Sequence, residues 1–238
     1  MTFEAKYLGS NGWLIKFEKV TLIIDPWLTG DLVFPPGEWF FKGSLDKEVI
    51  IEENINMILL TQGLADHCHI PSLKKLKKNI DIICPNSAKR ILEKLNFTSI
   101  QVLKPSEKAN QHGLVIEATA GAPVPQLENG YVVKDINGKG FYIEPHGYLD
   151  ENLKSQEIDA VITPIINLEL PFVGSFVKGA DVIPKLINTF NPQYILSSTI
   201  GGEAKYTGIL NKFISIQEYK DEINCKLVNL KIMDSVKI

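Results

Sequence analysis

The sequence is poor in histidine and cysteine and has no long apolar run. Its 238 residues include four histidines and three cysteines. Cys68, Cys84 and Cys225 are widely spaced and form no C-x-x-C pair, which excludes a zinc knuckle and argues against a disulfide framework. No apolar run approaches the roughly 20 residues that cross a bilayer, and the start lacks a basic-then-apolar signal pattern. We therefore expect a cytoplasmic protein without a membrane partner.

The charge of the chain is small and spread out. Lysine and arginine number 25 against 28 aspartates and glutamates, so the formal net charge is -3, and no Lys/Arg-rich tract occurs. Nucleic acids and anionic membranes are bound through concentrated positive charge, so neither is expected as a partner. Hydrophobic residues make up 45% of the chain, which is ordinary globular usage. We expect one domain over residues 1–238 that binds a small molecule; the oligomeric state stays open.

The first part of the chain indicates antiparallel strands. Residues 7–15 place two apolar runs on either side of Gly9-Ser10-Asn11-Gly12, whose residues tolerate the positive φ of a hairpin turn. Residues 20–24 form a β-branched run that is too apolar for a solvated face, and Asp25-Pro26 closes it. This run predicts a central strand that ends at an acidic corner. Residues 31–44 carry too many prolines and glycines for regular structure and predict an aromatic-rich loop.

Strand-and-helix units follow, with short alternating strands between them. Apolar runs bounded by turn residues predict strands, and apolar residues at helical spacing predict helices. The expected strands are 58–60, 80–84, 160–163 and 194–196, the expected helices begin at Pro71 or span 87–95 and 180–190, and alternating strands fill 102–143. Two strand-rich stretches, each followed by helix-containing units, predict an α/β fold. Two mixed sheets would pack together with helices on their outer faces, as a four-layer αββα sandwich.

The segment richest in reactive side chains is residues 60–69, between a predicted buried strand and a helix. It contains Asp66, His67 and His69, with Cys68 as a weaker donor. Carboxylate, imidazole and thiolate are the usual ligands of zinc and its neighbours. The alternative interpretation is that Asp66 caps backbone N–H groups at the start of the helix, with solvated histidines beside it. Local spacing leaves both interpretations open.

The same segment resembles the signature of the metallo-β-lactamase superfamily, Thr/Ser-His-x-His-x-Asp-His, with Thr61, Asp66 and His67 in register. The stretch from Tyr7-Leu8-Gly9 to Asp25-Pro26-Trp27 is similar to the start of the branch that includes L-ascorbate-6-phosphate lactonase-like proteins. Asp159–Pro164 and Lys178-Gly179-Ala180 resemble its C-terminal half. The resemblance covers nearly the whole chain, and it implies the αββα fold and a metal-dependent hydrolase.

Several positions depart from this pattern. Gln62 and Leu64 stand where the family carries its first two histidines, and leucine cannot coordinate a metal. Residues 118–123 and 196–199 offer no histidine where the resemblance places two more. His146 stands where the resemblance places a bridging aspartate. Four histidines are too few for the usual two-metal site, so the first metal position is predicted to be empty.

Asp66, His67 and His146 remain, and the resemblance places all three around the second metal position. Three protein ligands plus water is the general form of an open catalytic zinc site. We therefore expect at most one divalent metal ion, zinc first, with Glu144 or His69 as a fourth ligand. The alternative is a metal-free polar pocket in which Asp66 orients a histidine by hydrogen bonding.

The sequence thus predicts a hydrolase-like protein in which Asp66 and His146 are catalytic. Ester, lactone and phosphoester substrates follow from the resemblance alone, since a fold does not set a function. One alternative is a non-catalytic ligand-binding or scaffold protein that keeps the fold; another is a metal-free enzyme with an Asp–His acid–base pair. Residues 39–41, all aromatic, would line a lid or cover the edge of the core. Gly201-Gly202 is predicted as a helix-entry turn.

Overall fold

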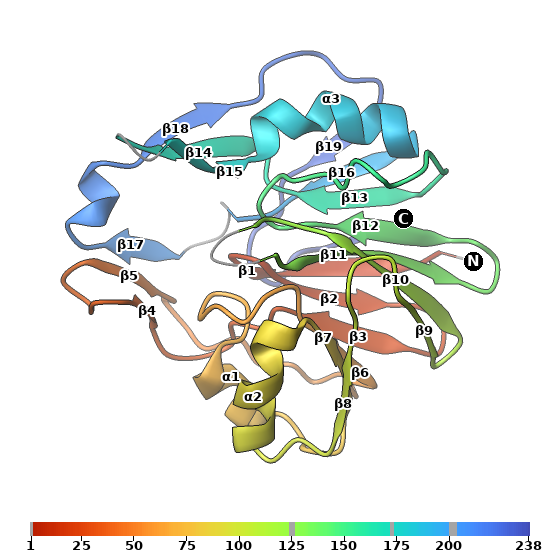
Figure 1. Cartoon of the computed structure of the whole chain (residues 1–238), viewed down its shortest axis with the longest axis horizontal. Helices are drawn as coiled ribbons and strands as arrows, with labels where there is room; N and C mark the ends of the chain where they lie inside the picture. The colour runs from red at the N-terminus through yellow and green to blue at the C-terminus, as the bar shows by residue number, and fades with distance from the viewer. Residues whose placement is uncertain (1, 124–126, 172–173, 200–203) are drawn as a thin grey trace.

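Two seven-stranded sheets packed face to face dominate the computed structural model, which describes residues 2–123, 127–171, 174–199 and 204–238 (Figure 1). The first sheet has the order β20-β1-β2-β3-β6-β7-β8, and the second has the order β19-β16-β13-β12-β11-β10-β9. The strands of the first sheet are β1 (Glu4–Gly9), β2 (Gly12–Lys16), β3 (Thr21–Ile24), β6 (Met57–Leu59), β7 (Asp81–Cys84), β8 (Ser99–Val102) and β20 (Ser235–Lys237). Those of the second sheet are β9 (Lys108–Gln111), β10 (Leu114–Ala120), β11 (Asn129–Asp135), β12 (Gly140–Ile143), β13 (Ala160–Thr163), β16 (Tyr194–Ser197) and β19 (Lys226–Val228).

The central strands of both sheets are apolar on both faces. In β3, Leu22 belongs to the core between the sheets, whereas Ile23 belongs to the cluster on the outer face. In β13, Ile162 faces the core between the sheets and Val161 faces the opposite side. Successive side chains of a strand point to opposite faces, so a run that is apolar at every position needs a packed layer on each side. Residues 20–24 were predicted as a central strand and residues 160–163 as a strand, and both predictions are confirmed.

Helices supply the two outer layers. α1 (Ile70–Lys75) and α2 (Asn86–Lys94) cover the outer face of the first sheet, where Leu73 and Leu92 join its apolar cluster. α3 (Gly179–Phe190) covers the second sheet through Leu186 and Phe190 (Figure 1). It ends at Asn191, which has the left-handed φ of +43° that suits a helix end. The predicted αββα sandwich is therefore confirmed. None of the helices in the described ranges is both long enough and apolar enough to cross a membrane.

Two small three-stranded sheets flank one end of the sandwich (Figure 1). Their orders are β17-β5-β4 and β15-β14-β18. Their strands are β4 (Leu32–Phe34), β5 (Phe41–Ser44), β17 (Lys205–Thr207), β14 (Ile166–Leu170), β15 (Gly174–Lys178) and β18 (Ser215–Glu218), and the short helix η1 spans Leu210–Lys212.

The prediction of an irregular loop for residues 31–44 is wrong, because the segment contains the β4–β5 hairpin. Its two prolines, 35 and 36, lie in the turn, where a strand needs no backbone donor, so they do not interrupt the pairing of Phe34 with Phe41. The aromatic run is split: Trp39 is 61% exposed, whereas the ring of Phe41 stacks on Tyr206 with centroids 5.7 Å apart. The predicted Gly201-Gly202 turn lies outside the described residues.

The loops that matter for function meet at one edge of the sandwich. β3 runs parallel to β6, and β12, β13 and β16 run parallel to one another, so each set has its carboxyl ends together. The turn between β1 and β2 lies at the same edge as the end of β3, because Trp13 pairs with Ile24. Polar groups that follow the carboxyl ends of parallel strands are well placed to bind ligands.

Gly147, just after β12, is expected to be far more sensitive to substitution than Gly138 in the β11–β12 turn. Both have positive φ, +73° and +79°. A Cβ on Gly147 would lie 2.3 Å from the backbone N of Gly179, whereas a Cβ on Gly138 would meet nothing within 4 Å.

We expect Gly138→Ala to lower the free energy of unfolding by about 1–2 kcal/mol, from backbone strain alone. Gly147→Ala should lower it by roughly 2–5 kcal/mol, because overpacking against α3 adds to the same strain. Urea denaturation of both variants measures the difference. Equal losses would show that the loop after β12 is not held against α3.

Candidate metal centre

The candidate site begins with a buried carboxylate at the end of β3. Asp25 is fully buried and has a φ of +41°. Its Oδ1 accepts a hydrogen bond from the backbone N–H of Thr61 at 2.8 Å, and its Oδ2 accepts one from the Thr61 hydroxyl. The same Oδ2 lies 2.8 Å from Nδ1 of His67. Asp25 therefore fixes the loop after β6, and Nε2 of His67 lies on the side of Asp66, 3.2 Å from its Oδ2.

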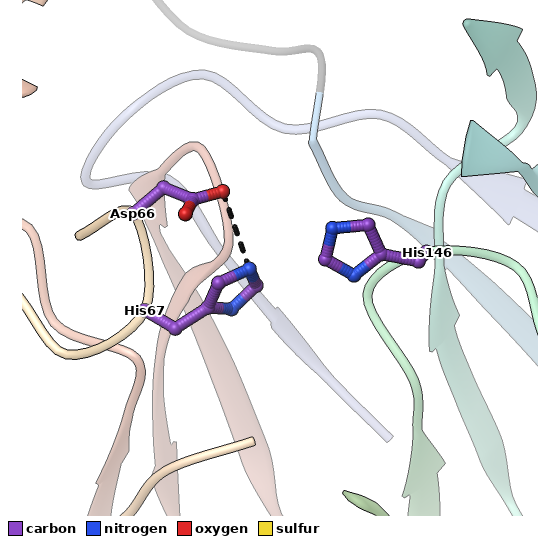
Figure 2. Close-up of side chains that lie close together, drawn as sticks. All are labelled: Asp66, His67 and His146. Atoms are coloured by element: carbon purple, nitrogen blue, oxygen red, sulfur yellow. Dashed lines mark ion pairs between the residues drawn. The ribbon is translucent and has the colours of Figure 1, made fainter. Parts of the chain in front are cut away.

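Three potential metal ligands converge in front of this carboxylate. One ligand atom each from Asp66, His67 and His146 lies within 4.8 Å of the other two. Figure 2 shows Asp66 and His67 side by side on one loop, with His146 facing them from the loop after β12. The rings of the two histidines have centroids 5.1 Å apart. The structure thus brings together the three residues that the sequence predicted as ligands, and it draws them from both large sheets.

Burial and charge set the protonation of this cluster. Burial alone would lower the pKa of His67, but the carboxylates of Asp66 and Asp25 outweigh burial and raise that pKa well above its usual range. Burial alone would raise the pKa of Asp66, yet the His67 charge and hydrogen bond hold it below its usual range. Burial and the charge of His67 lower the pKa of His146 to about 3. Without a metal, His67 is therefore charged and His146 is neutral.

The residues present fit a single divalent cation. Oδ1 of Asp66 is buried and has no hydrogen-bond partner among the described residues, although a buried carboxylate oxygen normally has one. Zinc binds imidazole and carboxylate at about 2.0–2.2 Å, so an ion between the three residues would draw the ligand atoms somewhat closer together. His67 also shows the carboxylate–histidine pairing that orients most metal-bound histidines, with Asp25 as its partner.

Two amide side chains complete the surroundings of the cluster. Nδ2 of Asn11, in the β1–β2 turn, lies 3.4 Å from Oδ2 of Asp66 and 3.3 Å from Nε2 of His67. Nε2 of Gln62 lies 2.9 Å from Nδ1 of His146. The Thr199 hydroxyl lies 3.0 Å from Oδ1 of Asn11 and so orients that amide. Asp66 is therefore next to the amide of Asn11, His67 next to the carboxylate of Asp25, and His146 next to the amide of Gln62.

His69 and Cys68 lie outside the cluster. The ring of His69 has Nδ1 2.8 Å from the Ser72 hydroxyl and Nε2 3.3 Å from the backbone oxygen of Asp31, so both its nitrogens are engaged near the start of α1. Cys68 is buried among apolar side chains, and this burial raises the pKa of its thiol to about 12. Neither side chain offers a free donor atom to the three-residue group.

Glu144 holds the backbone of the loop after β12. Its carboxylate accepts hydrogen bonds from the backbone N–H groups of Ala122 at 3.2 Å, His146 at 3.0 Å and Tyr148 at 2.6 Å. Burial raises its pKa to about 7, although these three bonds oppose the shift. Glu144 therefore positions His146 through the main chain, whereas the sequence suggested it as a fourth ligand.

The sequence reasoning missed Asp25, Asn11 and Gln62 as site residues. Asp25 was noted only as the acid that closes an apolar strand, and Asn11 only as a turn residue. An acid directly after a fully apolar strand is a usable signal, since such a corner lies at the carboxyl end of the sheet. Gln62 was noted only as a departure from a ligand pattern. No local signal marks its contact with His146, which is 84 positions away in the sequence.

Solved structures share the fold across the whole chain at low identity. The metallo-β-lactamase fold protein YhfI from Bacillus subtilis has a TM-score of 0.65 at 12% identity, over 98% of this chain and 99% of that chain. Igni18, a metallo hydrolase from the hyperthermophilic archaeon Ignicoccus hospitalis, has a TM-score of 0.64 at 13% identity, over 100% and 99%. CmlA, a diiron β-hydroxylase from Streptomyces venezuelae, has a TM-score of 0.59 at 14% identity, over 84% of this chain and 45% of that chain. This chain therefore spans less than half the length of CmlA. At these identities the likeness shows the fold alone.

A family model covers most of the chain. No curated protein matches the sequence. The family model described as "Beta-lactamase superfamily domain" matches residues 4–198. This range runs from the start of β1 to the residue after β16, so it includes Asp25, the loop after β6 and His146. The match and the shared sandwich show that this chain belongs to the β-lactamase superfamily and has the metallo-β-lactamase fold.

Proposed function

We propose that this chain is a hydrolase that uses one divalent metal ion, zinc first, held by Asp66, His67 and His146. The observation that carries the proposal is the convergence of these three ligand atoms within 4.8 Å, with one buried carboxylate oxygen left unpartnered. Two imidazoles and one carboxylate form a ligand set of the catalytic zinc type, which keeps a position open for water or substrate. Igni18, a metallo hydrolase with the same fold, supports the reaction class.

Gln62 and Leu64 support one metal rather than two. They stand where the family signature carries histidines, and neither side chain supplies an imidazole. Among the described residues, Asp66, His67 and His146 are the one group of three or more metal-ligating side chains close enough to share an ion. Gln62 contacts Nδ1 of His146 instead of supplying a metal ligand of its own.

The chain's own residues define what the site can do. A bound divalent ion supplies polarisation of a carbonyl or phosphoryl oxygen and lowers the pKa of water. Asp66 is ionised, so its carboxylate oxygen that does not hold the ion could accept a proton from a water molecule. Asn11 Nδ2 holds Oδ2 of the same carboxylate and limits its rotation. Small esters, lactones and phosphoesters are the substrates we propose, with the resemblance to the L-ascorbate-6-phosphate lactonase-like branch favouring a cyclic ester.

A second candidate is a metal-free ligand-binding protein that keeps the fold. It is favoured by the contacts that the three side chains make with other protein groups. Asn11 Nδ2 donates to Oδ2 of Asp66, Nε2 of His67 lies 3.2 Å from the same oxygen, and Gln62 contacts His146. A polar pocket of this kind could bind a ligand by hydrogen bonding without turnover.

Metal content separates the two candidates. We expect the chain, loaded with zinc, manganese or iron and measured by elemental analysis, to hold close to one metal per chain, with zinc preferred. His67→Ala and His146→Ala should each remove the metal, because two ligands cannot form the site. His112→Ala is the control, since His112 is an exposed residue of the β9–β10 turn in the second sheet and pairs with Asp81 at 2.9 Å, outside the cluster.

The same three variants test turnover on lactones, carboxylic esters and phosphoesters. The zinc-loaded chain should hydrolyse at least one of these classes, His112→Ala should match it, and His146→Ala should lose activity by about 100-fold or more. A wild-type chain that takes up no metal under any loading condition would overturn the proposal. Metal uptake without turnover on any of these classes would overturn the hydrolase and would also rule out the metal-free binding protein.

Asp25→Asn should weaken zinc binding without removing it. The substitution keeps an oxygen for the backbone N–H of Thr61 but loses the negative charge that orients His67 at 2.8 Å. We expect the zinc Kd to rise by about 10–100-fold, the usual cost of losing a partner of a metal-bound histidine. Competition with a chromogenic chelator measures it.

Asp81→Asn is the matched control for Asp25→Asn, because Asp81 also pairs with a histidine, at a partly exposed position outside the cluster. It should leave the zinc Kd unchanged. If both variants bind zinc as the wild type does, then Asp25 has no role at the metal.

A further inference from the structure

We propose that Gln62 is a positioning residue. Its terminal amide rotates by half a turn when metal binds, and this rotation selects the tautomer of His146. This inference rests on the proposed function. It concerns a residue that replaces a ligand in the family signature and that makes its own contact with the remaining site.

The contact is buried and specific. Gln62 is fully buried in the loop after β6, and its Nε2 lies 2.9 Å from Nδ1 of His146, which follows β12 in the other large sheet. The second amide atom, Oε1, is buried without a hydrogen-bond partner among the described residues. One ring nitrogen of His146 is thus occupied by Gln62, and Nε2 is left to face Asp66 and His67 (Figure 2).

The tautomer of His146 follows from which amide atom faces Nδ1. A neutral imidazole carries one proton, on either nitrogen. When the amide N–H of Gln62 donates to Nδ1, the proton lies on Nε2, which then faces Asp66 as a donor. When Oε1 of Gln62 accepts from Nδ1–H, Nε2 has a free lone pair. A metal needs the second arrangement, because a metal-bound histidine donates its other N–H to an acceptor.

A terminal amide can serve both arrangements with one rotation. Its oxygen and nitrogen ends have nearly the same shape, so a half-turn exchanges a donor for an acceptor without moving His146. In the metal-free arrangement, the Nε2–H of His146 faces Asp66 (Figure 2). In the metal-loaded arrangement, Oε1 of Gln62 accepts a hydrogen bond from Nδ1–H of His146 and gains the partner that it lacks.

The partner of His67 is different in kind. Asp25 offers only acceptor atoms to Nδ1 of His67, so His67 keeps its Nδ1 proton with or without a metal. A carboxylate at position 62 would also accept from His146, but it would add a third negative charge beside Asp25 and Asp66. The amide supplies the acceptor without that charge, and burying an uncompensated charge is costly.

The tautomer is measured directly by NMR of protein labelled with ¹⁵N-histidine. The chain has only four histidines, and the spectrum of His146→Ala assigns the signal. We expect His146 to carry its proton on Nε2 in the metal-free chain and on Nδ1 in the zinc-loaded chain. The same tautomer in both states would overturn the proposal, and this measurement needs no substitution at Gln62.

Substitutions at Gln62 test the energetic consequence. Gln62→Leu removes both donor and acceptor and should raise the zinc Kd by about 10–100-fold. Gln62→Glu keeps an acceptor and should bind zinc at least as tightly as the wild type, with the Nδ1 proton already present in the metal-free state. Gln111→Leu is the control. The side-chain amide of Gln111 also donates one hydrogen bond, to Gln101 at 3.1 Å, and Gln111 lies on β9, away from the cluster.

The outcomes distinguish this inference from the proposed function. A wild-type zinc Kd in Gln62→Leu would overturn the role of Gln62 and leave the metal-dependent hydrolase standing. Equal weakening in Gln62→Leu and Gln62→Glu, with both variants folded by circular dichroism, would show that packing rather than an acceptor matters, and would also overturn it. If the wild-type chain binds no zinc, both proposals are overturned together.

Discussion

The buried carboxylate of Asp25 ties the first sheet to the candidate site. Its two oxygens receive the backbone N–H and hydroxyl of Thr61 and lie 2.8 Å from Nδ1 of His67. A carboxylate removed from water is costly unless its lone pairs are filled, so the loop after β6 must close over Asp25 for the pairing of β3 with β6 to be stable. The same closure brings Asp66, next to His67, to the edge where the other sheet ends. One interaction therefore serves stability and the geometry of the site.

The site also depends on the packing of one sheet against the other. Asp66 and His67 belong to the first sheet, whereas His146 follows a strand of the second. The loop that carries the first two is bonded across the interface, because the hydroxyl of Tyr131 donates to the backbone oxygen of Leu60 at 2.9 Å and the N–H of Asn129 donates to that of Thr61 at 3.1 Å. Ligands on rigid, cross-linked loops keep their spacing, which is what preorganised sites require.

The layers of the fold could be predicted from the sequence because strand periodicity is local. Residues 22–24 are apolar at every position and buried, which suits a strand that is covered on both faces. Asp66 and His67 could be found for the same reason, since they adjoin each other on a predicted loop. His146 was reached only through the family resemblance. The place of Asp25 after an apolar strand marks it as a site candidate, but its pairing with His67 could not be inferred, because no local pattern relates two loops 42 positions apart.

Charge balance explains why neutral amides surround a site that contains two carboxylates. Without a metal, the raised pKa of His67 gives it one positive charge against the two negative charges of Asp25 and Asp66, and the cluster carries one net negative charge. A divalent ion that displaces the His67 proton brings the sum to zero, whereas a trivalent ion leaves one positive charge. Burial favours the neutral sum. Asn11 and Gln62 are neutral, so they orient the ligands without changing this net charge. Both the ligands and the residues around them therefore suit a divalent ion.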